Sequence, residues 1–285
     1  MTSPIYSLPL ELINAIIDEI YNDSDTKTAR LTFKSCSLVS KIFVNRTREH
    51  LFREIKIRSN LQCERLLARS PRIHAFTTSL VITWMFRRGR GCPTSTLTDL
   101  PSLIDALHNV NKIKLIGMRW KSLSRKFIDS LASRSFISVT LIRVHFTDSN
   151  AFYSFLSHSP NLREISCLVT VIDSNDRPPF SASFDSSYRP HIIGLCLHKT
   201  NQIAEMILSP SFSPMSLDRL RVLDVLLEQD HHFNLARCLM ELTTQSLEAL
   251  HVSLFSRPSP DRSEYLPIQR STFEVYRYRD DGLSP

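Results

Sequence analysis

The sequence predicts an α/β protein in which a short three-helix module precedes an irregular solenoid, a curved parallel sheet with helices on its outer side. Three observations predict this fold. An apolar helical stripe opens the chain, a six-residue apolar pattern recurs downstream, and helix-like segments separate its copies. Strands that alternate with helices favour a parallel sheet. The chain has 285 residues, of which 42% are apolar, so it can bury a substantial core.

Residues 1–58 are expected to form the helical module. Five apolar residues fall on one side of a helix that begins near Pro9, whose missing N–H costs nothing in a first turn. A second helix is expected over about residues 26–36, and a third over about residues 40–52. The apolar stripe comprises Leu12, Ile13, Ile16, Ile17 and Ile20.

A module of this size cannot bury the whole stripe by itself. Chains of about 60 residues or fewer bury too little apolar surface for a comfortable core. We therefore expect the stripe to pack partly against another part of the chain or against another protein. A helical cap on the following domain is the simpler of these two interpretations, and the spacing of the residues leaves both open.

An apolar triplet with spacing Φ-x-x-Φ-x-Φ recurs through residues 59–255, at intervals of 23 to 36 residues. This period is typical of leucine-rich repeats, although the Asn that usually closes their strand turn is missing. Residues 256–285 are expected to be a polar tail or an incomplete further repeat. Strands are expected near residues 55–58, 79–84, 113–118, 139–144, 162–168, 192–197, 220–226 and 247–253.

Four short motifs in the first 58 residues resemble an F-box. They are LPLEL (residues 8–12), the pair Ile16 and Ile17, CSLVSKIF (residues 36–43) and LFREIKI (residues 51–57). The order and spacing of these motifs are those of the family, in which Trp often stands where this chain has Phe43. The resemblance implies that the module binds the adaptor subunit of SCF-type cullin-RING ubiquitin ligases and that the remaining domain holds a substrate protein. The adaptor-binding residues that it implies are Leu8, Pro9, Leu10, Glu11, Ile16, Ile17, Leu38, Val39 and Phe43.

The second face of the predicted sheet is a candidate recognition surface. Side chains alternate between the two faces of a strand, so the residues between the apolar positions lie opposite the core. Many of them are polar or charged. A surface that binds a substrate protein has this character, and so does any solvated face, so both interpretations stay open. The candidate substrate-binding residues are Arg119, Arg143, His145, His198, Asp224 and His251.

Positive charge is concentrated in the middle of the chain. The net charge is +7, and residues 61–150 contain 14 Lys and Arg against 5 Asp and Glu. These charges are scattered, and the basic stretch RRGRG (residues 87–91) lacks regularly spaced aromatic neighbours. We expect no specific nucleic-acid binding, only salt-sensitive non-specific association. A nucleic-acid-associated protein is the weakest of the functional interpretations.

Nothing in the sequence predicts catalysis, a cofactor or a metal. Phosphate-binding glycine motifs and a GxSxG elbow are missing. His231 and His232 with Cys238 lack a further pair of ligands at suitable spacing, so no metal site is expected. The six cysteines form no CxxC pair and are expected to be reduced. No apolar run approaches the ~18 residues of a membrane helix, and the first twenty residues do not read as a secretion signal. We expect a cytoplasmic or nuclear protein, not a secreted one.

The functional expectation is therefore a non-catalytic substrate-recognition subunit of an SCF-type ubiquitin ligase. Its expected partners are the adaptor subunit and a substrate protein of unknown identity. The alternative is a protein-binding repeat protein with a degenerate F-box and no role in a ligase.

Overall fold

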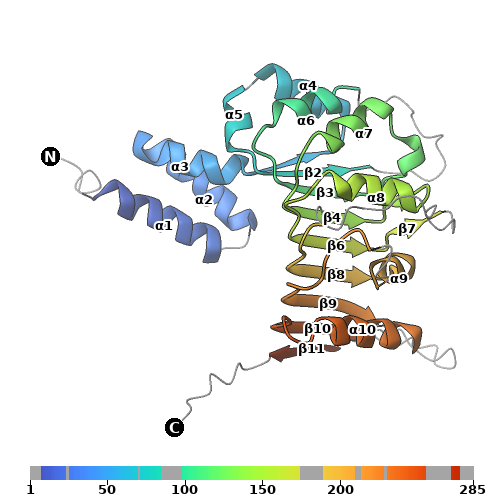
Figure 1. Cartoon of the computed structure of the whole chain (residues 1–285). Helices are drawn as coiled ribbons and strands as arrows, with labels where there is room; N and C mark the ends of the chain where they lie inside the picture. Colours follow the sequence, from blue (N-terminus) through green and yellow to red (C-terminus); the bar gives the residue numbers. More distant parts are fainter. Residues whose placement is uncertain are drawn as a thin grey trace, which may run out of the picture. The chain divides into compact units, whose positions relative to one another are not determined.

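The computed structural model describes residues 8–23, 26–69, 71–84, 98–173, 189–208, 213–227, 230–254 and 271–276 (Figure 1). The chain divides into two compact units. The first comprises Met1–Val81 and Leu97–Val110, and the second comprises Ile82–Thr96 and Asn111–Pro285.

The first unit contains the predicted helical module together with the elements that follow it. These elements are α1 (Leu10–Asp23), α2 (Thr26–Val39), α3 (Lys41–Phe52), β1 (Glu54–Ile57), α4 (Asn60–Arg69), α5 (Pro71–Phe76), the start of β2 (Ser79–Thr83) and α6 (Leu100–Ala106). The strands β1 and β2 are neighbours in the sheet.

Part of the predicted apolar stripe, Ile13, Ile17 and the half-buried Ile20, lies in the core of the module, whereas Leu12 and Ile16 are exposed. Ile13 and Ile17 of α1 are buried against Ala29 and Phe33 of α2, and Phe43 of α3 packs against this cluster. The amphipathic spacing of α1 thus accounts for the packing of all three helices.

The second helix of the module is longer than predicted and ends at Val39. The hydroxyls of Ser35 and Ser37 donate hydrogen bonds to carbonyls of the preceding turn, so these serines do not break the helix. The interruption falls at Ser40, whose extended backbone and side chain cap α3.

The second unit alternates strands with helices. Its main elements are β3 (Lys112–Ile116), α7 (Arg125–Ala132), β4 (Ser138–Ile142), α8 (Ser149–Ser157), β6 (Glu164–Leu168), β8 (Gly194–His198), α9 (Asn201–Leu208), β9 (Val222–Leu227), α10 (Asp230–Leu242) and β10 (Ala249–Leu254). Strands β3, β4, β6, β8, β9 and β10 pair in this order, and every pairing is parallel. All eight predicted strands are present, so an α/β fold in which N-terminal helices precede a parallel sheet is confirmed.

Three further strands were not predicted. The two-residue strands β5 (His145–Phe146) and β7 (Val171–Ile172) pair with each other as a separate small sheet. Strand β11 (Ser271–Tyr276), within the predicted tail, pairs with β10 and is antiparallel to it. A further repeat of the same kind would have added a parallel strand.

Alternate residues of the parallel strands build the core of the second unit. Val139 and Leu141 in β4 are buried, as are Ile165 and Cys167 at the matching positions of β6. In Figure 1, α8, α9 and α10 lie along one side of these strands. The residues between the buried ones therefore form the opposite, open face of the sheet.

A left-handed backbone residue follows four successive strands. These residues are Gly117, Arg143, Val169 and Lys199, with φ between 53° and 68°. The N–H of Gly117 donates to the carbonyl of Ile142 at 2.8 Å, and Arg143 and Val169 make the same bond to the last residue of the next strand. These four strands thus end in the same backbone conformation, although three of the four residues are not glycine.

Among the residues that the structure describes, no helix combines the length and the apolar character needed to cross a membrane.

Candidate functional site: the open face of the parallel sheet

The strand register of the second unit aligns side chains across the open face. Parallel pairing brings Cys196 of β8 opposite Asp224 of β9, and Asp224 opposite His251 of β10. We call the full set of aligned residues the polar row. It comprises Lys114, Thr140, Ser166, Cys196, Asp224 and His251.

A second row lies two residues further along each strand on the same face. Most of its members are apolar, and all are half-buried. We call it the apolar row. It comprises Ile116, Ile142, Leu168, His198, Leu226 and Ser253. Half-exposed aliphatic side chains beside a polar row give this face the mixed character of a protein-binding surface.

A shallow hollow of about 370 Å³ lies on the open face. Thr140, Ser166, Cys196, Asp224 and His251, all from the polar row, contribute to its lining. The hollow therefore exposes the centre of this row.

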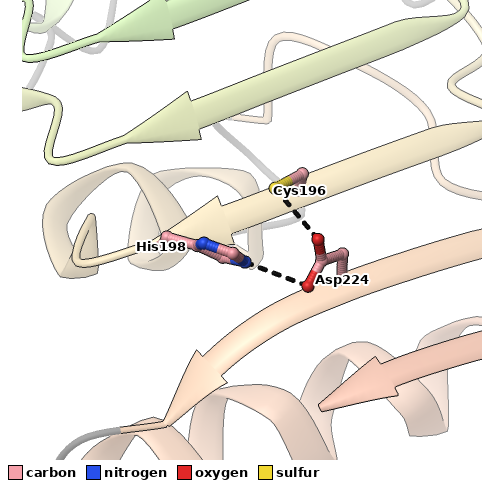
Figure 2. Close-up of side chains that lie close together, drawn as sticks. All are labelled: Cys196, His198 and Asp224. Atoms are coloured by element: carbon pink, nitrogen blue, oxygen red, sulfur yellow. Dashed lines mark hydrogen bonds and ion pairs between the residues drawn. The ribbon is translucent and has the colours of Figure 1, made fainter. Parts of the chain in front are cut away.

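Three chemically reactive side chains meet in the polar and apolar rows. Figure 2 shows Cys196 and His198, which lie two residues apart on β8, converging on Asp224 of β9. The Nε2 atom of His198 lies 2.9 Å from Oδ1 of Asp224. The Sγ–H group of Cys196 donates to Oδ2 of Asp224 at 3.5 Å. Both carboxylate oxygens are thus in use.

His198 and Asp224 form an ion pair within this cluster. The hydrogen bond with Asp224, with a further contribution from Cys196, raises the pKa of His198 to about 10. Burial raises the pKa of Asp224, but the hydrogen bond and charge of His198 outweigh it, so the pKa falls below its ordinary value. The side chains of His198 and Asp224 remain 23% and 35% exposed, so the pair is accessible from solvent.

The structure brings together only some of the predicted substrate-binding residues. His198, Asp224 and His251 lie on neighbouring strands of the open face, as the alternation predicted. Arg119 lies beyond the end of β3 and His145 beyond the end of β4, in the short strand β5, and the two residues pair in an isolated bridge. Nδ1 of His145 also lies 3.5 Å from Oδ1 of Asp173.

The placement of Arg119, Arg143 and His145 on the sheet face was therefore wrong. Gly117 and Arg143 have positive φ, and this conformation ends the extended strand. The predicted alternation was also out of phase in β3 and β4, because Arg119 and Arg143 lie an even number of residues after Leu115 and Leu141, whose side chains are buried in the core.

Cys196 was missed as a functional candidate. It precedes His198 by two residues, which places both side chains on one face of a strand. Asp224 follows Cys196 by 28 residues, the same distance that separates the repeats beginning at Ile192 and Leu220. Comparing equivalent positions of successive repeats would have brought the three residues together.

Most of the predicted adaptor-binding residues are exposed on the first unit. Leu38 and Val39, at the end of α2, are 87% and 71% exposed. Ile17, by contrast, is 1% exposed and cannot touch a partner, because its side chain fills the core of the module. Phe43 packs against the same core. The other predicted residues, all exposed, are Leu8, Pro9, Leu10, Glu11 and Ile16.

Two features singled out in the sequence, the basic stretch and the histidine pair, lie wholly or partly outside the part of the chain that the structure describes. The basic stretch at residues 87–91 lies outside the described residues, and so do the side chains of His231 and His232.

Comparison with protein-family models finds no family that matches this chain, and comparison with curated proteins finds no match either. The resemblance to an F-box therefore rests on the order and spacing of the short motifs between residues 8 and 57.

Proposed function

We propose that the protein is the substrate-recognition subunit of an SCF-type cullin-RING ubiquitin ligase. The observation that carries this proposal is the set of exposed apolar side chains on α1 and at the end of α2, within the F-box-like motifs. Clustered large apolar side chains on a surface commonly mark an interface. We assign this surface to the adaptor subunit.

The apolar residues of the module fall into a buried set and an exposed set. Ile13 and Ile17 point into the core and hold the three helices together. Ile16 points outward and is 53% exposed, as are Leu10 and Leu12 to a similar degree. In this proposal Ile17 and Phe43 support the adaptor surface from beneath, and the exposed residues make the contacts.

We further propose that the second unit is a divergent leucine-rich-repeat-like solenoid with a curved sheet and outer helices. The left-handed residue that follows β3, β4, β6 and β8 and the uniform register of these strands support a common repeat unit. Its open face, with the polar and apolar rows, is the surface we assign to the substrate protein.

The proposed role is positioning. The protein itself catalyses nothing. It holds a substrate close to a ligase whose reactive components other subunits supply, in the cytoplasm or the nucleus.

Phe43 favours the alternative function, a protein-binding repeat protein with a degenerate F-box. It stands where the F-box family often has Trp, and it presents a smaller apolar surface. In the alternative, the open face still binds a protein, but the module binds no adaptor.

Co-purification with the adaptor separates these functions. We expect the wild-type chain to retain the purified adaptor, and the double variant Leu8→Ala/Pro9→Ala to lose most of it, because apolar contact is removed and the start of α1 is loosened. The thermal unfolding of the second unit should shift little, which distinguishes lost contact from lost fold. A wild type that retains no adaptor rejects the ligase role in favour of the alternative. Equal retention by the variant would show that these residues are not the adaptor surface.

A further inference from the structure

We propose that Cys196, His198 and Asp224 form a binding site for a divalent transition-metal ion of the Zn²⁺ type on the open face of the second unit. The ligand atoms are Sγ of Cys196, Nε2 of His198 and a carboxylate oxygen of Asp224, which all lie within 4.8 Å of one another. The site goes beyond the ligase role and does not depend on it, because its residues belong to the other unit.

The donor set selects the class of metal. Thiolate, imidazole and carboxylate are the three side-chain donors that Zn²⁺ accepts. Mg²⁺ and Ca²⁺ require shells built almost entirely of oxygen, which a sulfur and a nitrogen cannot supply. The site is therefore expected to bind Zn²⁺ or a similar first-row ion and to ignore Mg²⁺ and Ca²⁺.

The donors need small shifts to bind one tetrahedral ion, because Cys196 and His198 contact different oxygens of the Asp224 carboxylate. Bonds of about 2.3 Å to sulfur and about 2.0 Å to nitrogen or oxygen place tetrahedral ligand atoms about 3.3–3.5 Å apart. Sγ of Cys196 lies 3.5 Å from Oδ2 of Asp224. Nε2 of His198 lies 2.9 Å from Oδ1, a hydrogen-bonding distance that must widen by a few tenths of an ångström. A metal ion would take the place of the protons that now join the three groups.

The backbone holds the donors in place. Cys196 and Asp224 are paired across two hydrogen-bonded strands, and His198 follows two residues later on the same strand. Leu168 and Leu226 flank His198 in the apolar row. Donors on paired strands require little reorganisation to bind an ion, and aliphatic neighbours reduce competition from water.

A fourth ligand is available on the other side of Asp224. His251 of β10 is the strand partner of Asp224 and lines the same hollow. His251 is not part of the group whose ligand atoms lie within 4.8 Å of one another, so its side chain would have to move to bind the ion, and a ligand from solvent can complete the shell instead. The open position would also allow a bound partner to contribute a ligand.

Other His–Asp pairs of the second unit lack the third donor. His191 lies 2.8 Å from Asp218, and His145 lies 3.5 Å from Asp173. Within the described part of the chain, the trio on β8 and β9 is the one group of three such donors. The His191 pair and the exposed Cys238 therefore provide matched controls.

Titration of the reduced, metal-free full-length protein with Co²⁺ tests the site. We expect a thiolate-to-cobalt charge-transfer band that saturates at one ion per chain and disappears when Zn²⁺ is added. Cys196→Ser should abolish the band, and Asp224→Asn should weaken Co²⁺ binding at least tenfold. The controls Cys238→Ser and His191→Gln should leave both the band and the affinity unchanged. No band in the wild type, or a band that survives in Cys196→Ser, would overturn the proposal.

A second measurement needs no substitution at the site. Zn²⁺ should slow the alkylation of Cys196 by N-ethylmaleimide, read by peptide mass spectrometry, and should leave the alkylation of Cys238 unchanged. Equal rates for Cys196 with and without Zn²⁺ would also overturn the site, even if the variants fail to fold.

Discussion

Gly117 occupies a position where any side chain would meet the backbone. Its φ is +68°, and a Cβ atom there would lie 2.6 Å from the carbonyl oxygen of Trp84. The oxygen cannot move freely, because the Trp84 N–H is hydrogen-bonded to Ile116 at the start of the same turn. The residue is therefore constrained by both conformation and space.

Gly117→Ala should lower the free energy of unfolding by about 2 kcal/mol or more, since the left-handed conformation alone costs roughly 1–2 kcal/mol with a Cβ atom. Urea unfolding followed by circular dichroism measures the change. The matched control is Gly194→Ala, whose Cβ atom would make an ordinary 3.6 Å contact with Glu164. The control should change stability by less than about 1 kcal/mol. Equal effects of the two substitutions would contradict this account of the strand end.

At this scale, strand alternation predicted the correct face for His198, Asp224 and His251 but not for Arg119, Arg143 and His145. Cys196, His198 and Asp224 share a face because side chains alternate regularly within a strand. Arg143, Val169 and Lys199 adopt positive φ without being glycine, so the sequence carried no signal that the strands end there. The error in placing Arg119, Arg143 and His145 also reflects a wrong phase of the predicted alternation in β3 and β4, where Leu115 and Leu141 are the buried residues.

In the helical module, one carboxylate links α1 to α3. Asp18 accepts hydrogen bonds from Nε and Nη2 of Arg46 at 2.7 and 2.5 Å. Nε2 of His50 lies 2.7 Å from the same carboxylate, and Arg46 also pairs with Glu49. The hydrogen bonds from Arg46 are the main reason that the pKa of Asp18 falls to about 2.

This pairing should make the module sensitive to acid. A carboxyl group whose pKa is lower in the folded state stabilises that state above its ordinary pKa of 3.8 and loses this contribution as pH falls towards 2. Because the Asp18 side chain is 36% exposed, solvent screening limits the contribution to about 1 kcal/mol. We expect Asp18→Asn to destabilise the module by about this amount at pH 6 and by much less at pH 2, measured by hydrogen exchange of α1 and α3.

Asp129→Asn is the matched control for this measurement. Asp129 pairs with Arg125 on an exposed surface of the second unit, so its substitution should have little effect at either pH. An Asp18→Asn variant that is destabilised equally at pH 2 and pH 6 would show that the charge of Asp18 does not stabilise the module.

The eight strands could be predicted because seven of them bury two or three apolar residues each, and β10 carries half-buried Leu250 and Val252 at the matching positions. The strands β5 and β7 have two residues each, too few to show any period. The antiparallel pairing of β11 depends on hydrogen bonding at the sheet edge, which no pattern within one repeat encodes. The length of α2 was underestimated because serines are common at helix ends and here lie inside a helix.

The charge distribution of the whole molecule bears on nucleic-acid binding. The net charge is +7, and the excess is concentrated in residues 61–150. Because this charge is scattered along the segment, we expect weak binding to duplex DNA that falls steeply between about 50 and 200 mM salt and shows no preference for sequence. Fluorescence anisotropy across this range measures it. Sequence-selective binding at physiological salt would contradict the expectation and would support a nucleic-acid role.

The sequence predicted only some of the residues at the candidate sites of the two units. The F-box-like motifs pointed to exposed apolar residues at the start of the chain, and most of them are exposed. Burial of Ile17 could not be anticipated, because Ile16 and Ile17 are adjacent on the stripe and only the packing of α1 on α2 decides which one points inward. The cluster of Cys196, His198 and Asp224 could be found only by aligning the polar residues of two successive repeats, whereas the prediction compared their apolar residues.

The dissociation constant of the full-length protein for the purified adaptor tests the central claim most directly. Leu38 and Val39 are the most exposed apolar residues of the module, so Leu38→Ala/Val39→Ala can remove contacts without disturbing its core. Truncated apolar anchors at the centre of an interface typically cost about 2 kcal/mol or more. We therefore predict measurable wild-type binding by calorimetry, weakened at least about thirtyfold in the double variant and unchanged by Leu242→Ala, which removes an exposed apolar side chain from the second unit. Absence of wild-type binding, or equal affinities for wild type and double variant, would contradict the account.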